Sequence, residues 1–73
     1  MKPLKEKLLV KDATINKIQF DTEWFYKLDD MTYYLKEDLS AVEFIYLPMI
    51  IDGNQEYVKC AGFNDIIRGR KEL

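Results

Sequence analysis

The sequence of 73 residues contains no histidine, one cysteine and two prolines. Without histidine, the chain has no imidazole for acid–base catalysis or metal ligation. A single cysteine allows neither an intrachain disulfide nor a cysteine-cluster metal site. No apolar run approaches the ~20 residues of a membrane-spanning helix, and the run at residues 8–10 is too short for a signal peptide. Because the unpaired cysteine also suits a reducing compartment, we expect a cytoplasmic protein without metal, cofactor or membrane contact.

The residues that are present are typical of one small globular domain. Apolar types make up 48% and charged types 33% of the chain, a balance that favours folding over disorder. The net charge of −2 is unevenly distributed, with +3 over residues 1–20, −5 over residues 21–43 and zero over residues 44–73. The acidic middle argues against a nucleic-acid binder with an overall basic surface.

The first half of the chain predicts an arm, a hairpin and a helix. Residues 1–12 are weakly patterned, and we expect an arm that is either disordered or packed over a domain at 13–70. Alternating apolar residues predict strands at 14–20 and 23–27. An apolar stripe behind Asp29 and Asp30 predicts a helix reaching residue 39 that frays at its acidic end.

The second half predicts another hairpin and helix. Residues 42–51 favour a strand that Pro48 places at an edge or a bulge, with a short helix from Ser40 as the alternative. The turn at 52–54 leads to a strand at 55–60, and residues 62–68 predict a helix that Gly69 ends, followed by a tail at 71–73. The chain is therefore predicted to be an α+β domain of order ββαββα, with this core: Ile18, Phe20, Trp24, Met31, Leu35, Phe63, Ile66 and Ile67.

Most chemically interesting residues have a structural explanation. Cys60 is expected to be a buried apolar residue rather than a reactive thiolate. The neighbouring acids at 29–30 and 37–38 suit capping and solvation better than catalysis or metal binding. The aromatic group at 24–26 and 33–34 has acidic neighbours, so we expect core and interface roles instead of base stacking. We therefore expect no catalytic residues and no enzymatic activity.

Two surfaces are candidates for binding. Arg68, Arg70 and Lys71 follow the last apolar stripe and could contact phosphates, although cations also suit a helix end. The uncharged stretch Phe44, Ile45, Tyr46 and Leu47 predicts self-association, because an unguarded strand edge pairs readily and a small domain gains stability by burying more surface. The expected partner is a second copy of the chain or another regulatory protein, with DNA as the alternative.

Residues 17–70 resemble a reduced version of the N-terminal domain of phage antirepressor and Bro-type proteins, which is also similar to part of the bacterial DNA-damage-inducible proteins. The resemblance lies in the order of short motifs: Lys17-Ile-Gln-Phe, Glu23-Trp-Phe, Leu28-Asp-Asp-Met, Leu35, Leu47-Pro48, Asp52-Gly53, Tyr57 and Ile66-Ile67-Arg68. It implies a small α+β module that binds DNA or a regulatory protein. The chain departs from the family in its acidic charge and its short segment between Leu39 and Phe44. Family members usually carry a variable C-terminal effector domain after this module, and we expect none here.

Overall fold

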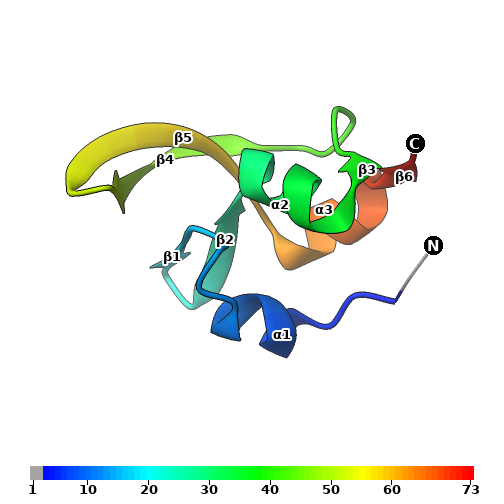
Figure 1. Cartoon of the computed structure of the whole chain (residues 1–73), viewed down its shortest axis with the longest axis horizontal. Helices are drawn as coiled ribbons and strands as arrows, with labels where there is room; N and C mark the ends of the chain where they lie inside the picture. The colour runs from blue at the N-terminus through cyan, green and yellow to red at the C-terminus, as the bar shows by residue number, and fades with distance from the viewer. Residues whose placement is uncertain (1–2) are drawn as a thin grey trace.

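The computed structural model describes residues 3–73, and its centre is a four-stranded antiparallel sheet of order β1-β2-β5-β4 (Figure 1). Three helices and a two-stranded sheet of β3 and β6 complete the described part of the chain. The protein is therefore a small α+β domain. The elements are α1 Glu6–Lys11, β1 Lys17–Phe20, β2 Glu23–Lys27, α2 Leu28–Leu35, β3 Glu37–Asp38, β4 Ile45–Ile51, β5 Asn54–Gly62, α3 Phe63–Gly69 and β6 Lys71–Glu72.

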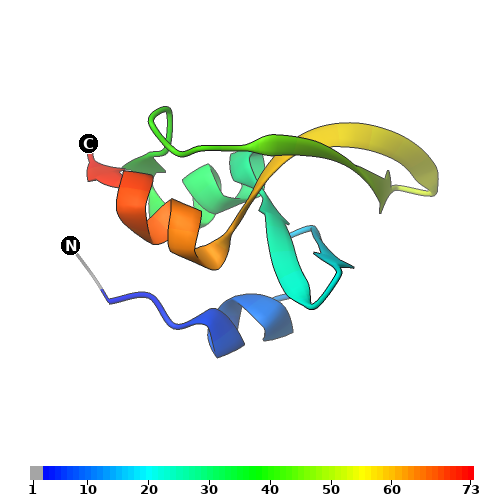
Figure 2. The same cartoon turned by 180° about the vertical axis from the view of Figure 1, so that it is seen from behind.

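The hairpin of β4 and β5, which we call the ribbon, is the longest feature of the sheet. It curves away from the helices and ends in a free tip (Figures 1 and 2). Its turn consists of Asp52 and Gly53, whose φ angles of 51° and 80° are both positive, as a two-residue type I′ turn requires. The predicted turn is therefore confirmed, and it sets a register in which Ile51 faces Asn54 and Ile45 faces Cys60.

The two faces of the sheet cover different hydrophobic clusters, because side chains alternate along a strand. One face carries Tyr26 and Ala61 and packs against the helices with Leu9, Met31 and other apolar residues. The opposite face of the ribbon packs its buried residues Met49, Val58 and Cys60 against the β1–β2 hairpin. A domain of this size thus divides its core into two parts that meet at β5.

Helix α2 is shorter than predicted. It ends at Leu35 because Lys36 adopts a left-handed conformation with φ 56°, and the Lys36 N–H donates to the Thr32 carbonyl oxygen at 2.8 Å. The predicted extension to residue 39 is wrong, since Glu37 and Asp38 form β3 instead. Acidic residues are unfavourable at a helix C-terminus, and Glu37 finds a buried cationic partner outside the helix.

Residues 6–11 and 71–72 form regular elements where the sequence predicts an arm and a tail. Helix α1 lies within the expected arm, its Leu9 side chain is fully buried, and the Tyr26 hydroxyl donates to Glu6 Oε2 at 2.8 Å. The described part of the arm therefore packs on the domain, and residues 1 and 2 lie outside the described residues. The expected tail forms β6, which pairs with β3.

The predicted core is correct in its centre and wrong at two positions. Met31 and Ile66 are fully buried, and Ile18, Trp24, Leu35 and Phe63 pack at the margins of the two clusters. Phe20 and Ile67 are 52% and 40% exposed. Phe20 ends an edge strand, where its ring meets Phe25 edge-on, and Ile67 lies on the outer side of a seven-residue helix.

Gly69 has a packing role that differs from the predicted one. It is the last residue of α3 and has no positive φ, so it does not end the helix in a left-handed conformation. A Cβ atom at this position would lie 2.7 Å from the Cα atom of Val42. Only glycine therefore allows the loop before β4 to pack directly on α3.

We expect Gly69→Ala to destabilise the domain, although alanine is about 1 kcal/mol better than glycine in a helix. The backbone of Val42 must move to admit the methyl group, and this cost exceeds the propensity gain. Urea unfolding measures the change. Asn64→Ala, at an exposed position of the same helix, is the control and should leave the free energy of unfolding nearly unchanged. A Gly69→Ala variant as stable as the parent would contradict the close approach.

We also expect Gly53→Val to lower the stability of the ribbon. A β-branched residue in the left-handed region costs roughly 1–2 kcal/mol, and no neighbouring atom lies within 4 Å to clash, so the effect comes from the backbone alone. Asn54→Asp, the next position along, should change thermal unfolding little. Equal melting temperatures for the two variants would place the turn elsewhere.

Candidate functional site

A buried ion pair joins the C-terminal end of α3 to the strand that follows α2. Arg70 Nε and Nη2 donate to Glu37 Oε1 and Oε2, each at 2.7 Å. Their side chains are 4% and 9% exposed. The two parallel bonds match the planar guanidinium to the carboxylate and lower the pKa of Glu37 below its ordinary value of 4.5. This pair holds β3 and β6 together on the body of the domain.

The predicted phosphate-contact set is therefore wrong at Arg70, whose charge is buried and already neutralised. Arg68 is exposed and pairs with Asp65, three residues earlier on α3. Lys71 is exposed on β6 and faces Asp38 across the two-stranded sheet. Each of the three cations thus has an acidic neighbour, and they do not form a joint basic patch.

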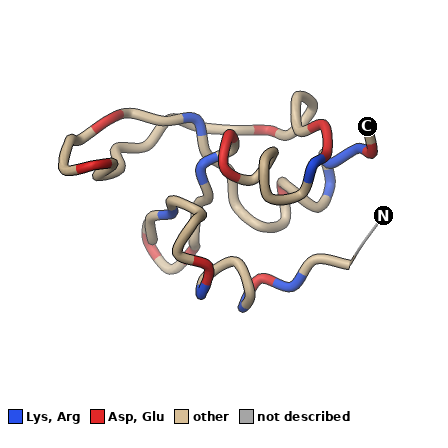
Figure 3. Tube along the Cα trace, viewed as in Figure 1, with Lys and Arg blue, Asp and Glu red and all other residues tan. Residues whose placement is uncertain are grey.

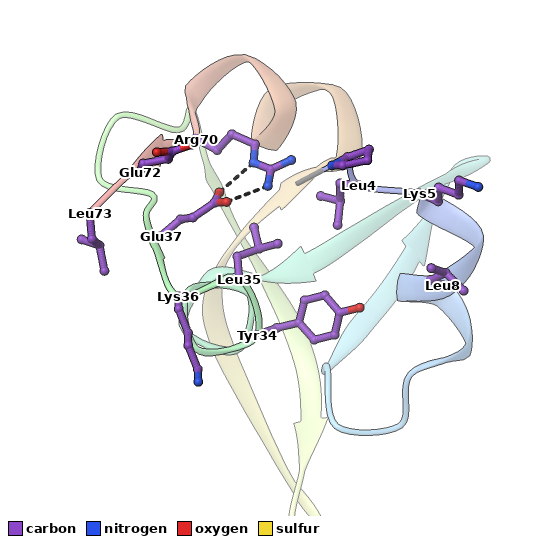
Figure 4. A pocket seen from close by; sticks show the side chains of 11 residues that line it. Leu4, Lys5, Leu8, Tyr34, Leu35, Lys36, Glu37, Arg70, Glu72 and Leu73 are labelled. Carbon is purple, nitrogen blue, oxygen red and sulfur yellow. Dashed lines mark hydrogen bonds and ion pairs between the residues drawn. The ribbon is translucent and has the colours of Figure 1, made fainter. Parts of the chain in front are cut away.

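A groove of about 920 Å³ opens beside this ion pair (Figure 4). The segment at 3–8 forms one wall, and the end of α2 and the C-terminal residues form the other. Its lining combines apolar side chains with two exposed lysines, Lys5 and Lys36. Since Arg70 and Glu37 compensate each other at its floor, the groove offers no uncompensated buried charge. Its lining residues are Pro3, Leu4, Lys5, Leu8, Tyr34, Leu35, Lys36, Glu37, Arg70, Glu72 and Leu73.

The ribbon has the more distinctive surface. Side chains alternate between the two faces of β4 and β5, and we call the face turned away from the β1–β2 hairpin the outer face. It is defined by the exposed residues Tyr46, Ile50, Gln55, Tyr57 and Lys59 and the half-buried Pro48. Tyr46, Ile50 and Tyr57 are 59%, 67% and 70% exposed. An antiparallel strand with one solvated face usually carries polar residues there, whereas every residue of β4 is apolar.

The predicted self-association surface divides between the two faces. Phe44 and Tyr46 meet edge-on at 5.7 Å on the outer side, and the Lys59 amine lies 4.5 Å from the centre of the Phe44 ring. Ile45 is 44% exposed on the opposite face, and Leu47 packs against the cluster of Met49, Val58 and Cys60. Ile50 and Tyr57 also lie on the outer face, although neither belongs to the predicted surface. Strand alternation counted back from the Asp52-Gly53 turn would have placed both on the same face as Tyr46.

The remaining candidates have structural roles. Cys60 is fully buried, donates to the Ile45 carbonyl oxygen at 3.5 Å, and has a pKa raised by burial. Asp30 accepts bonds from the backbone and side-chain nitrogens of Asn16, both at 2.8 Å. Asp38 accepts from the Ser40 N–H at 2.9 Å. These carboxylates organise loops.

Within residues 3–73, no group of three histidine, cysteine or acidic side chains is placed to hold a metal ion. No helix in the same range has the length and apolar content needed to cross a membrane. No protein-family model, no curated protein and no solved structure matches this chain. The relationship to the antirepressor family therefore stays a prediction.

We expect Arg70→Ala to destabilise the domain by about 3–5 kcal/mol, because it leaves the Glu37 carboxylate buried without a partner. Arg68→Ala, which removes an exposed ion pair, should cost less than about 1 kcal/mol. Circular dichroism during urea unfolding compares the two. Similar losses for both variants would mean that burial of the Arg70–Glu37 pair contributes nothing.

The same pair makes stability depend on pH. Because the pKa of Glu37 is lower in the folded than in the unfolded chain, its contribution is complete above pH 4.5 and is lost as the pH falls through the lowered pKa. Bonds from Thr14 and Ser40 also lower the pKa values of Asp12 and Asp38. We therefore expect Glu37→Gln to be less stable at neutral pH but to lose less stability on acidification, without becoming insensitive to pH. An unchanged acid profile would contradict this role.

Proposed function

We propose that the chain is a non-catalytic interaction module that acts in cytoplasmic regulation and forms a homodimer through the outer face of the ribbon. The observation that carries the proposal is the apolar character of β4 at its exposed positions. Tyr46 and Ile50, with the half-buried Pro48 between them on the same face, occupy places where a solvated strand would carry polar side chains. Contiguous apolar surface of this kind is typical of protein-binding sites.

Two further features favour a protein partner over DNA. The outer face contains one cation, Lys59, and that amine already lies against the Phe44 ring. The cations of the C-terminal region are paired or face acids, so neither surface offers the several free cations that phosphate binding uses. The resemblance to antirepressor N-terminal domains, which suggests a regulatory role in phage or DNA-damage responses, agrees with a protein-binding module.

Sedimentation equilibrium over a dilution series tests the dimer. We expect a mass near twice 8.7 kDa at high concentration, and a shift to the monomer for Tyr57→Lys, which puts a charge in the middle of the outer face. Tyr33→Lys is the matched control, because Tyr33 is an equally exposed tyrosine, 83% exposed on α2, and its replacement should leave the mass unchanged. A monomer at every concentration would overturn the proposal.

A further inference from the structure

Edge-to-edge pairing of two ribbons is poorly supported by the backbone. Strand β4 is an edge of the sheet, and a two-residue turn is flanked by a hydrogen-bonded pair, here Ile51 and Asn54. Hydrogen-bonded positions alternate along an antiparallel strand. The backbone groups of residues 45, 47 and 49 therefore bond to β5, and those of residues 46, 48 and 50 point toward the free edge of the sheet. The middle of this outward row is Pro48, which has no N–H to donate. The side chains of the outer face, rather than the free edge, therefore offer the contact.

The charges along the ribbon run in one direction. Lys59 lies at the base of the outer face, opposite Tyr46, and Asp52 lies at the tip. In Figure 3 the base of the ribbon is accordingly blue at Lys59 and the tip is red at Asp52. The second red segment of the ribbon is Glu56, which pairs with Met49 and lies on the face opposite the outer face. Six residues separate position 46 from position 52, which corresponds to roughly 20 Å along a strand.

Resting on the proposed dimer, we infer that two ribbons pack face to face and antiparallel, so that Lys59 of each copy lies over Asp52 at the tip of the other. A twofold axis between positions 48 and 49 of β4, close to the Pro48–Tyr57 pair, brings both pairs within reach of the long Lys59 side chain at once. It also stacks Tyr46 of one copy near Ile50 of the other. The parallel arrangement would instead place Lys59 against Lys59 and Asp52 against Asp52, so charge selects the antiparallel one.

The available area fits a dimer that forms and dissociates readily. Aromatic side chains bury roughly 150–250 Å² each, so Tyr46 and Tyr57, at 59% and 70% exposure, contribute on the order of 200–300 Å² together. Ile50, Pro48 and Phe44 add to this area. The sum stays below the ~800 Å² per partner of a standard stable interface. With so little apolar area, the two peripheral ion pairs become a measurable part of the affinity.

A double-mutant cycle tests the arrangement with Lys59→Gln, Asp52→Asn and the combined variant. Asparagine is preferred in a type I′ turn, so Asp52→Asn preserves the ribbon, and far-ultraviolet circular dichroism verifies that each variant folds. We expect each single substitution to raise the dissociation constant of the dimer about 2- to 10-fold. The dissociation constant of the double variant should be no higher than that of the single variant with the larger loss. Lys59→Gln also removes the contact between Lys59 and Phe44. Because this loss occurs in the single and in the double variant, it cancels in the cycle. Lys11→Gln, which removes one positive charge at an exposed position of α1, is the control for net charge.

The outcomes separate the arrangement from the dimer itself. Non-additive effects, together with a wild-type dimer that salt weakens more than the double variant, support the antiparallel packing. Additive effects in a chain that still dimerises overturn the packing and leave the proposed function intact. Tighter dimerisation of the Lys59→Gln variant overturns the antiparallel packing in favour of the parallel arrangement. A wild-type chain that stays monomeric overturns both.

Discussion

The pairing of β5 with β2 over residues 60–62 is the constraint on which the rest of the structure depends. Cys60 faces Lys27, Ala61 faces Tyr26 and Gly62 faces Phe25, and this short register connects the ribbon to the body. Because side chains alternate, Cys60 enters the cluster against β1 and Ala61 enters the cluster beneath the helices. A shift by one residue would exchange the two and place the helix-facing surface in solvent.

The second constraint acts at the chain ends. Leu9 holds α1 in the helix-side cluster, whereas β3 and β6 contribute no residue to either cluster. Polar contacts supply the connection, with Tyr26 bonded to Glu6 at one end and Arg70 bonded to Glu37 at the other. An isolated buried charge would be strongly destabilising, so the positions of Arg70 and Glu37 are tied to each other.

The sequence predicts the local elements well and the long-range polar contacts poorly. Alternation and turn residues are local properties, and they place the two hairpins, α3 and the Asp52-Gly53 turn within a few residues. The Arg70–Glu37 pair joins residues 33 positions apart, and no pattern near either residue indicates it. For that reason the sequence suggests that Arg70 is a free surface cation and that Glu37 lies in the last turn of a longer helix.

The outer face of the ribbon was partly predictable for the same reason. The uncharged run of β4 attracts attention in the sequence, but a continuous apolar strand suggests burial on both faces. The missing information was which face the β1–β2 hairpin would cover, and that depends on the three-residue register between β2 and β5. Once Cys60 faces Lys27, Leu47 and Met49 must point toward the hairpin, and Tyr46 and Ile50 must point away from it.

The apolar outer face does not stabilise the single domain. The exposed residues Tyr57 and Ile50 belong to neither hydrophobic cluster. Polar residues at these positions would reduce the association of the ribbon with other chains. Pro48 blocks the free edge, where uncontrolled strand addition would begin, yet leaves the face open. A ribbon with a closed edge and an open apolar face restricts association to contacts between faces, which can form a closed pair rather than an extended sheet.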